Sequence, residues 1–102
     1  MHYNNSMSDI AAMLEGESGR IHWVELQPHF ARGVVFSVDS EINLIDVASS
    51  FVRDDESEVR SWLGQDKLTK VSDNQAREWL ESNPLFEAIV IAPWVLIQPA
   101  KH

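Results

Sequence analysis

The sequence predicts a small α+β fold in which a short sheet packs with four or five helices. Two mostly apolar runs, at about 34–38 and 86–92, are typical of buried strands and indicate the central strands of the sheet. Between them, apolar residues recur at helical spacing, and the capping-box pattern occurs at Asp55–Glu58 and at Ser72–Gln75. Helical and extended segments are therefore mixed along one short chain, as in α+β domains.

Length and composition favour one domain. The chain has 102 residues, of which 44% are hydrophobic and 24% are charged, an ordinary balance for a globular protein. We expect a flexible lead-in over residues 1–7 and a single α+β domain over residues 8–102.

Cysteine usage and hydropathy bear on the compartment. The chain contains no cysteine, which excludes disulfides, thiolate catalysis and cysteine-bound zinc. Its first residues lack the basic start and apolar run of a secretory signal. The longest apolar stretch, residues 88–97, is shorter than the roughly 20 residues of a spanning helix, and it contains Pro93. We therefore expect a cytoplasmic protein with no membrane partner.

Two short helices are expected in the first third of the chain. Ser8-Asp9 offers an N-cap to a helix over residues 10–14. Farther on, three apolar residues share one helical stripe: Trp23, Leu26 and Phe30. Gly33 suits the left-handed residue that follows a helix. Because Pro28 lacks an amide hydrogen and disfavours helix at the preceding residue, we expect a kink or two short helical pieces here.

The middle of the chain predicts three more helices. The first carries five apolar residues at helical spacing: Leu44, Val47, Ala48, Phe51 and Val52. Asp55 opens the second, which ends at Gly64. A short strand over residues 68–71 precedes the third, which Ser72 opens and Asn83-Pro84 ends.

The C-terminal run predicts strands and an interface. Residues 86–92 are apolar on both alternating faces, as in a strand covered on both sides. Pro93 lacks a donor for the ladder, so we expect a bulge or a crossing before residues 94–97 resume extended structure. If residues 94–97 form a sheet edge, their unpaired backbone groups can meet a second copy. We therefore expect a homodimer with Trp94 and Leu96 in its interface.

Acidic residues are concentrated in the middle of the chain. Sixteen acidic residues against eight basic ones give a net charge of -8, which repels phosphate backbones, so we expect no nucleic-acid partner. The segment 39–66 contains eight acidic residues but only Arg53 and Arg60 as basic ones. This segment is either a solvated surface or a docking surface for a basic protein partner.

His29 and Arg32 form the polar pair that is best placed for a ligand-binding site. They lie near the end of the expected helix, where positive charge complements the helix dipole. A ligand-binding site would join them to a carboxylate, and the candidates are Asp39 and Asp46.

The sequence gives little support for a metal site or a catalytic site. Glu25 and His29 have the spacing of two metal ligands on one helix face, but no local pattern supplies the remaining ligands, so we expect no metal site. Asp54-Asp55 fits acid–base chemistry less well than a hinge in which Asp55 caps a helix. There is no glycine-rich phosphate loop, nucleophile elbow or HExxH pattern, so we expect no catalytic residue and no cofactor.

Several motifs together resemble the bacterial domain of unknown function 2288 family. The motifs are Trp23-x-x-Leu26-x-Pro28-His29-x-x-Arg32-Gly33, Leu44-x-x-Val47-Ala48, Asp55-x-x-x-Val59-x-x-Trp62 and Ala92-Pro93-Trp94-Val95-Leu96-Ile97-Gln98. The resemblance spans roughly residues 21–98, and the family label implies no activity. One departure is Gln65-Asp66 before Lys67, where the family pattern leads us to expect a glycine.

A second likeness is to the helix-turn-helix of small excisionase and mercury-regulator proteins. It rests on Val47-Ala48-x-x-Phe51, Val59-x-x-Trp62 and Lys67-Leu68. In that motif the second helix needs basic or amide side chains, whereas here it opens with Asp55-Glu56-Ser57-Glu58. A helix pair without a DNA role is therefore the better interpretation.

These observations leave the function unknown and favour one class. We expect a non-enzymatic protein-interaction domain that forms a homodimer. The alternative is a small-molecule-binding protein or weak hydrolase that uses His29, Arg32 and a nearby carboxylate.

Overall fold

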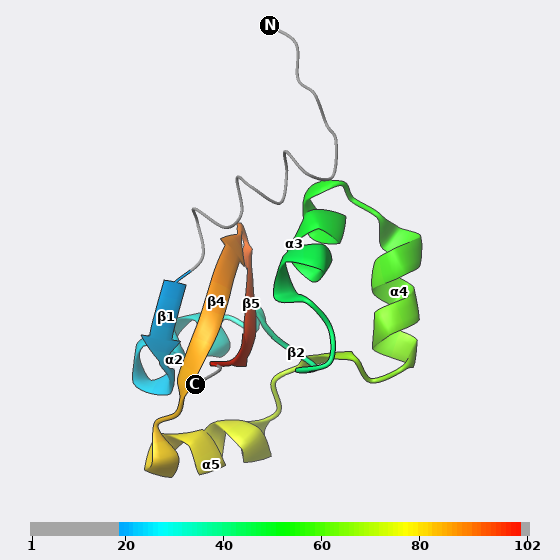
Figure 1. The fold of residues 1–102 in the computed structure, drawn as a ribbon. Helices are drawn as coiled ribbons and strands as arrows, with labels where there is room; N and C mark the ends of the chain where they lie inside the picture. The colour runs from blue at the N-terminus through cyan, green and yellow to red at the C-terminus, as the bar shows by residue number, and fades with distance from the viewer. Residues whose placement is uncertain (1–18, 101–102) are drawn as a thin grey trace, which may run out of the picture.

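A five-stranded mixed sheet forms the middle of the computed structural model, which describes residues 19–100 (Figure 1). The strand order is β1-β4-β5-β2-β3. The strands are β1 Gly19–His22, β2 Val35–Val38, β3 Leu68–Lys70, β4 Leu85–Ile91 and β5 Trp94–Pro99. β2 and β5 run parallel, and the other neighbouring strands run antiparallel. The expected lead-in over 1–7 and helix over 10–14 lie outside the described residues.

Four helices connect these strands. They are α2 Trp23–Ala31, α3 Leu44–Val52, α4 Glu56–Gly64 and α5 Asp73–Ser82. The predicted caps of the last two are confirmed: the Asp55 side chain accepts from the Glu58 amide, and Ser72 and Gln75 form a complete capping box. The sequence did not reveal the cap of α3, where the Asn43 side chain accepts from the Ile45 amide.

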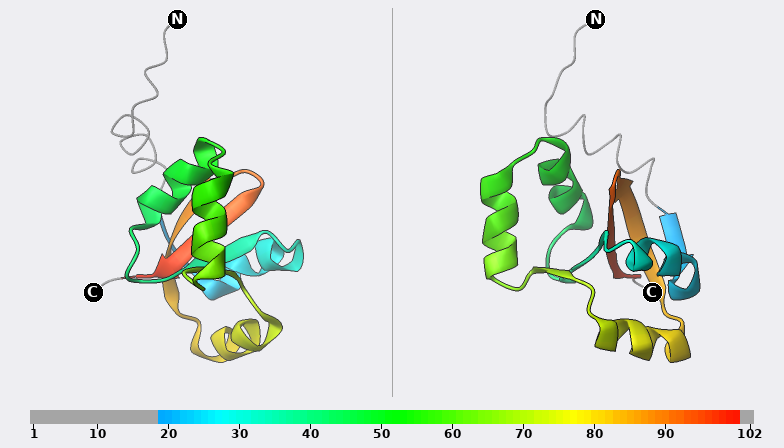
Figure 2. Two further views of the ribbon diagram at one scale, coloured as in Figure 1. Left: turned by 90° about the vertical axis from the view of Figure 1, so that its right-hand side faces the viewer. Right: turned by 180° about the vertical axis from the view of Figure 1, so that it is seen from behind.

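The helices cover both faces of the sheet, because successive side chains of a strand point to opposite sides. On one face, Leu96 of β5 joins a core cluster with residues of α3, including Val47 and Ala48. On the other face, Val95 and Ile97 join a cluster with residues of α2 and α5. In the view from behind, α2 lies in front of the strands, and α3 and α4 lie together to the left of them (Figure 2, right). The α+β class is therefore confirmed, with the predicted strands β2 and β4 both inside the sheet.

The expectation that residues 94–97 form a sheet edge is wrong. β5 pairs with β4 on one side and β2 on the other, so its backbone groups are used within the monomer. The run is apolar because helices cover both faces, and Leu96 is 0% exposed. Pro93 lies in the turn of a β4–β5 hairpin and not within a strand, so neither a bulge nor a crossing is needed.

Of the two expectations at Pro28, division into two short helical pieces is wrong, whereas a kink stays a prediction. α2 is continuous over nine residues with Pro28 inside it. A proline within a helix costs about 3 kcal/mol. Burial of Trp23 and Leu26, each worth about 1.5 to 3 kcal/mol, offsets that cost. The helix ends as predicted, with Gly33 in the left-handed region at φ 72°.

Candidate functional site

An open groove lies between the sheet and the α3–α4 helix pair. Its volume is about 320 Å³. Six apolar side chains line it: Phe36, Phe51, Val59, Leu63, Leu68 and Trp94. We refer to it as the α3–α4 groove. It brings together residues from several strands and two helices, so only the folded chain assembles it.

Aromatic rings form one wall of the α3–α4 groove. The ring centroid of Phe36 is 6.2 Å from that of Phe51 and 5.5 Å from that of Trp94, with the latter pair edge to face. Such contacts hold the rings in fixed orientations. Trp94 remains 36% exposed and therefore offers apolar surface to a partner.

Acidic residues border the α3–α4 groove where the chain turns from α3 into α4. Asp54, Asp55 and Glu56 line this end together with Arg60. Asp54 adopts a left-handed backbone at φ 55°. Asp55 caps α4 and lies 4.0 Å from Arg53, whereas the exposed Glu56 forms a 3.7 Å ion pair with Arg60.

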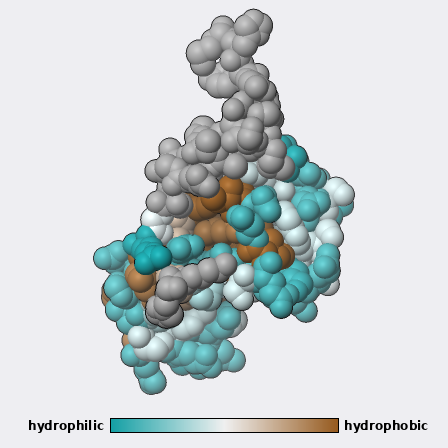
Figure 3. Space-filling view, in the orientation of Figure 1, coloured by the Kyte–Doolittle hydropathy of each residue, from teal (hydrophilic) through white to brown (hydrophobic). Residues whose placement is uncertain are grey.

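The border of the groove is therefore negative. Its three carboxylates outnumber two guanidinium groups, that of Arg60 in the lining and that of Arg53 beside Asp55. The exposed ion pair between Glu56 and Arg60 adds little to the stability of the fold, because water screens it. Apolar residues gather over the sheet beside α3, whereas hydrophilic residues dominate the α4 side (Figure 3).

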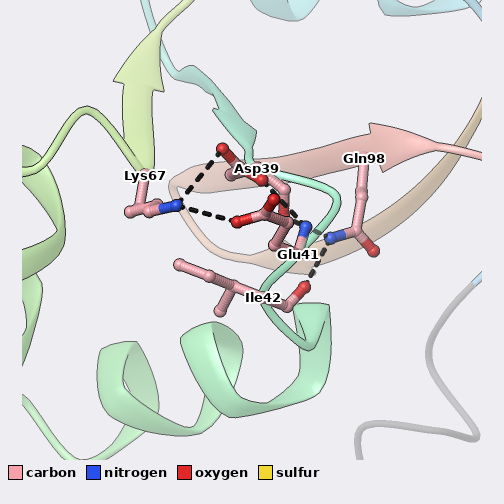
Figure 4. A network of polar contacts seen from close by, with 5 residues as sticks. All are labelled: Asp39, Glu41, Ile42, Lys67 and Gln98. Carbon is pink, nitrogen blue, oxygen red and sulfur yellow. Dashed lines mark hydrogen bonds and ion pairs between the residues drawn. The ribbon is translucent and has the colours of Figure 1, made fainter.

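A polar network fixes the loop between β2 and α3 (Figure 4). Gln98 is 4% exposed, and its side-chain amide donates to the carbonyls of Asp39 at 2.8 Å and Ile42 at 2.6 Å. Lys67 contacts Glu41 at 3.1 Å and Asp39 at 3.8 Å. The Asp39 carboxylate also accepts from the Glu41 amide at 2.8 Å. The Asp39 carboxylate is therefore engaged in contacts within the protein.

Lys67 is held in its charged form by this network. The hydrogen bond to Glu41 and the negative charges of Asp39 and Glu41 raise its pKa above the ordinary 10.5. The ammonium group therefore links β3 to the β2–α3 loop as a cation throughout the physiological pH range.

The structure brings His29 and Arg32 together but separates them from the candidate carboxylates. Nη2 of Arg32 lies 2.6 Å from Nδ1 of His29. Both residues are close to the chain that enters β2, because the Val34 amide donates to the His29 carbonyl. Asp39 follows the opposite end of β2. Asp46 is exposed in the first turn of α3, so the expected four-residue site is not assembled.

Two further findings concern the described part of the chain. Within residues 19–100, no three His, Asp or Glu side chains are close enough together to hold a metal ion. None of the helices α2 to α5 has the length and hydropathy needed to cross a bilayer.

The groove residues were not recognisable as a set from the sequence. Phe36 looks like an ordinary strand residue, and Phe51 and Val59 look like helix core. Trp94 was expected in an interface at a sheet edge and not in a groove. A further signal was the acidic Asp54-Asp55-Glu56 run beside aromatic positions. Strand pairing between β2 and β5 is what places the two aromatic strand residues side by side.

The fold and the groove define a small α+β domain with an acid-bordered apolar surface site. The chain belongs to the family described as Protein of unknown function (DUF2288), whose model matches residues 9–99. This confirms the resemblance seen in the sequence motifs. A search of curated proteins found no match.

A solved structure supports the same fold. The chain is 40% identical to the protein in the NMR solution structure of PA1075 from Pseudomonas aeruginosa, with a TM-score of 0.78. The match covers 100% of this chain and 94% of the other. The two proteins therefore share their fold over nearly their whole lengths.

Proposed function

We propose that the protein is a non-enzymatic interaction domain whose α3–α4 groove docks a basic segment of a partner protein. The observation that supports this proposal is an apolar groove bordered by Asp54, Asp55 and Glu56. An apolar anchor in a pocket with charged residues at its border is the usual arrangement of a binding hot spot. The partner segment would place one large apolar side chain against Trp94 and its basic residues beside the carboxylates.

Size and charge restrict the occupant. Ligand pockets usually measure about 300 to 1,000 Å³, and the groove at about 320 Å³ is near the lower limit. It therefore suits a single side chain better than a large cofactor. The net charge of -8 speeds the approach of a positive segment and repels a second acidic chain.

Labelled peptides test this proposal by fluorescence anisotropy. We expect saturable binding of Lys-Lys-Leu-Phe-Lys-Lys that weakens with added salt, because salt screens exposed charges. The acidic counterpart Glu-Glu-Leu-Phe-Glu-Glu and the anchorless Lys-Lys-Gly-Ser-Lys-Lys should bind at least fivefold more weakly.

Variants locate the binding. Combining Asp54→Asn with Glu56→Gln should weaken binding of the basic peptide about three- to tenfold, while Asp55 is left unchanged because it caps α4. The matched control combines Glu78→Gln with Glu81→Gln on α5, removes the same charge and should bind normally. Equal binding by the acidic peptide, or equal loss in both double variants, would contradict the proposal.

The proposal includes a homodimer in the cytoplasm. With Leu96 buried, the dimer surface must differ from the one expected from sequence. Support comes from the side formed by α2 and α5, since these helices carry the exposed apolar residues Val24 (55%) and Leu80 (54%). Asp73 and Arg77 line a hollow on this side, and a twofold axis would let each meet the opposite charge on the partner. The absence of cysteine supports a reducing compartment.

A further inference from the structure

The end of α2 meets the β4–β5 hairpin at a small cavity outside the α3–α4 groove. Its volume is about 270 Å³. His29 and Arg32 supply its polar side, and five residues supply apolar walls: Val34, Val90, Ala92, Pro93 and Val95. We refer to it as the His29–Arg32 cavity. It shares no lining residue with the groove, and Val95 packs with the core cluster on the other face of the sheet.

The charge of Arg32 is not compensated within residues 19–100. Among residues 19–100 no carboxylate lies within ion-pair distance of its guanidinium. Within the same residues, its side chain bonds only Nδ1 of His29. A guanidinium carries five N–H donors, so most of them remain available to a ligand.

His29 positions this guanidinium. Because arginine only donates, Nδ1 of His29 is the acceptor in this contact. This ring nitrogen holds Arg32 in place without supplying a carboxylate that would cancel its charge. The cavity therefore combines an oriented cation with an apolar wall.

We propose that the His29–Arg32 cavity binds the carboxylate of a small aliphatic acid. The carboxylate pairs with the Arg32 guanidinium, which matches its planar geometry, and the alkyl group lies against Val34, Val90 and Pro93. A volume of about 270 Å³ limits the ligand to a few carbon atoms beyond the carboxylate. This inference is independent of the proposed docking groove.

NMR titration of the isotope-labelled full chain with 3-methylbutanoate tests the proposal. We expect saturable shifts of the backbone amides of Gly33, Ala92 and Val95, which line or adjoin the cavity. The neutral 3-methylbutanamide has the same shape and should produce no saturable shift. Acetate supplies the charge without the alkyl group and should bind at least fivefold more weakly.

Two variants and a matched control locate the binding. Arg32→Gln should weaken 3-methylbutanoate binding at least tenfold, whereas Arg77→Gln removes an exposed arginine elsewhere and should leave it unchanged. Val90→Glu, at a site that is 54% exposed, places a carboxylate in the cavity wall and should also abolish binding.

A polypeptide C-terminus presents the same carboxylate chemistry, and N-acetyl-alanyl-valine distinguishes that source. Tighter binding of 3-methylbutanoate than of this peptide supports a free acid as the ligand. Tighter binding of the peptide, no saturation with 3-methylbutanoate, equal binding of the amide, or full binding by Arg32→Gln would each overturn the proposal.

Discussion

Two adjacent serines of α3 occupy buried positions with different hydrogen bonding. Ser49 is 0% exposed and its hydroxyl has no hydrogen-bond partner among residues 19–100, whereas the Ser50 hydroxyl accepts from Arg53 at 3.4 Å. A buried hydroxyl without a partner costs roughly 1 to 3 kcal/mol, and a hydrogen bond contributes only about 0.5 to 1.5 kcal/mol. The same residue type in neighbouring positions therefore has opposite effects on stability.

Ser49→Ala should raise the free energy of unfolding by about 1 kcal/mol, because it removes the unpaired hydroxyl and improves helix propensity. Ser50→Ala serves as the matched comparison, since it removes a bonded hydroxyl one residue away. We expect it to be less stable than Ser49→Ala by about 1 kcal/mol or more. Urea unfolding measures both, and equal stability of the two variants would contradict the assignment.

At the scale of elements, the continuity of α2 depends on its packing against other elements. Trp23 contacts three aromatic rings, with centroid distances of 5.6 Å to Phe30, 5.0 Å to Trp79 and 6.3 Å to Phe86. These contacts join α2 to α5 and β4. A helix with an internal proline is therefore held continuous by residues from other elements.

Pro28→Ala tests whether the internal proline has a cost in stability that the packing of α2 must offset. Pro28 is exposed, so its replacement removes little buried surface and restores the amide hydrogen that the helix lacks. We expect the free energy of unfolding to rise by about 1 to 3 kcal/mol. The exposed Gln65, just after α4, offers a control in Gln65→Ala, which should change stability much less. Destabilisation by Pro28→Ala, measured in urea, would show that the proline is needed.

At the scale of the whole molecule, opposite sides differ in character. The α3–α4 side carries the acidic border, whereas the side formed by α2 and α5 has exposed apolar residues beside charges of both signs. A net charge of -8 opposes the association of two copies at long range. Self-association should therefore use the α2–α5 side and strengthen as salt is added.

Sedimentation velocity at micromolar concentrations should show a dimer. Leu80→Lys places a charge on the α2–α5 side and should shift the protein towards monomer. Val52→Lys is the matched control on α3, where the replaced side chain is 40% exposed, and it should remain dimeric. A wild-type protein that stays monomeric over this range would refute the homodimer.

The sequence by itself determined most of the local structure. Apolar spacing located α3, α4 and α5, and local side-chain chemistry located the caps at Asp55 and Ser72 and the left-handed Gly33. These features depend on residues within one or two turns of each other, which a linear pattern contains. β1 was missed because a four-residue edge strand has too short a pattern and takes its pairing from β4.

Tertiary structure decided which residues meet. It placed β5 between β4 and β2, which buried Leu96 and left no free sheet edge at residues 94–97. It brought Phe36 and Trp94 together from distant segments, and it put Asp39 at the far end of β2 from His29. Strand order and register depend on how all faces are buried at once, so they follow from packing of the whole chain and not from any local run of residues.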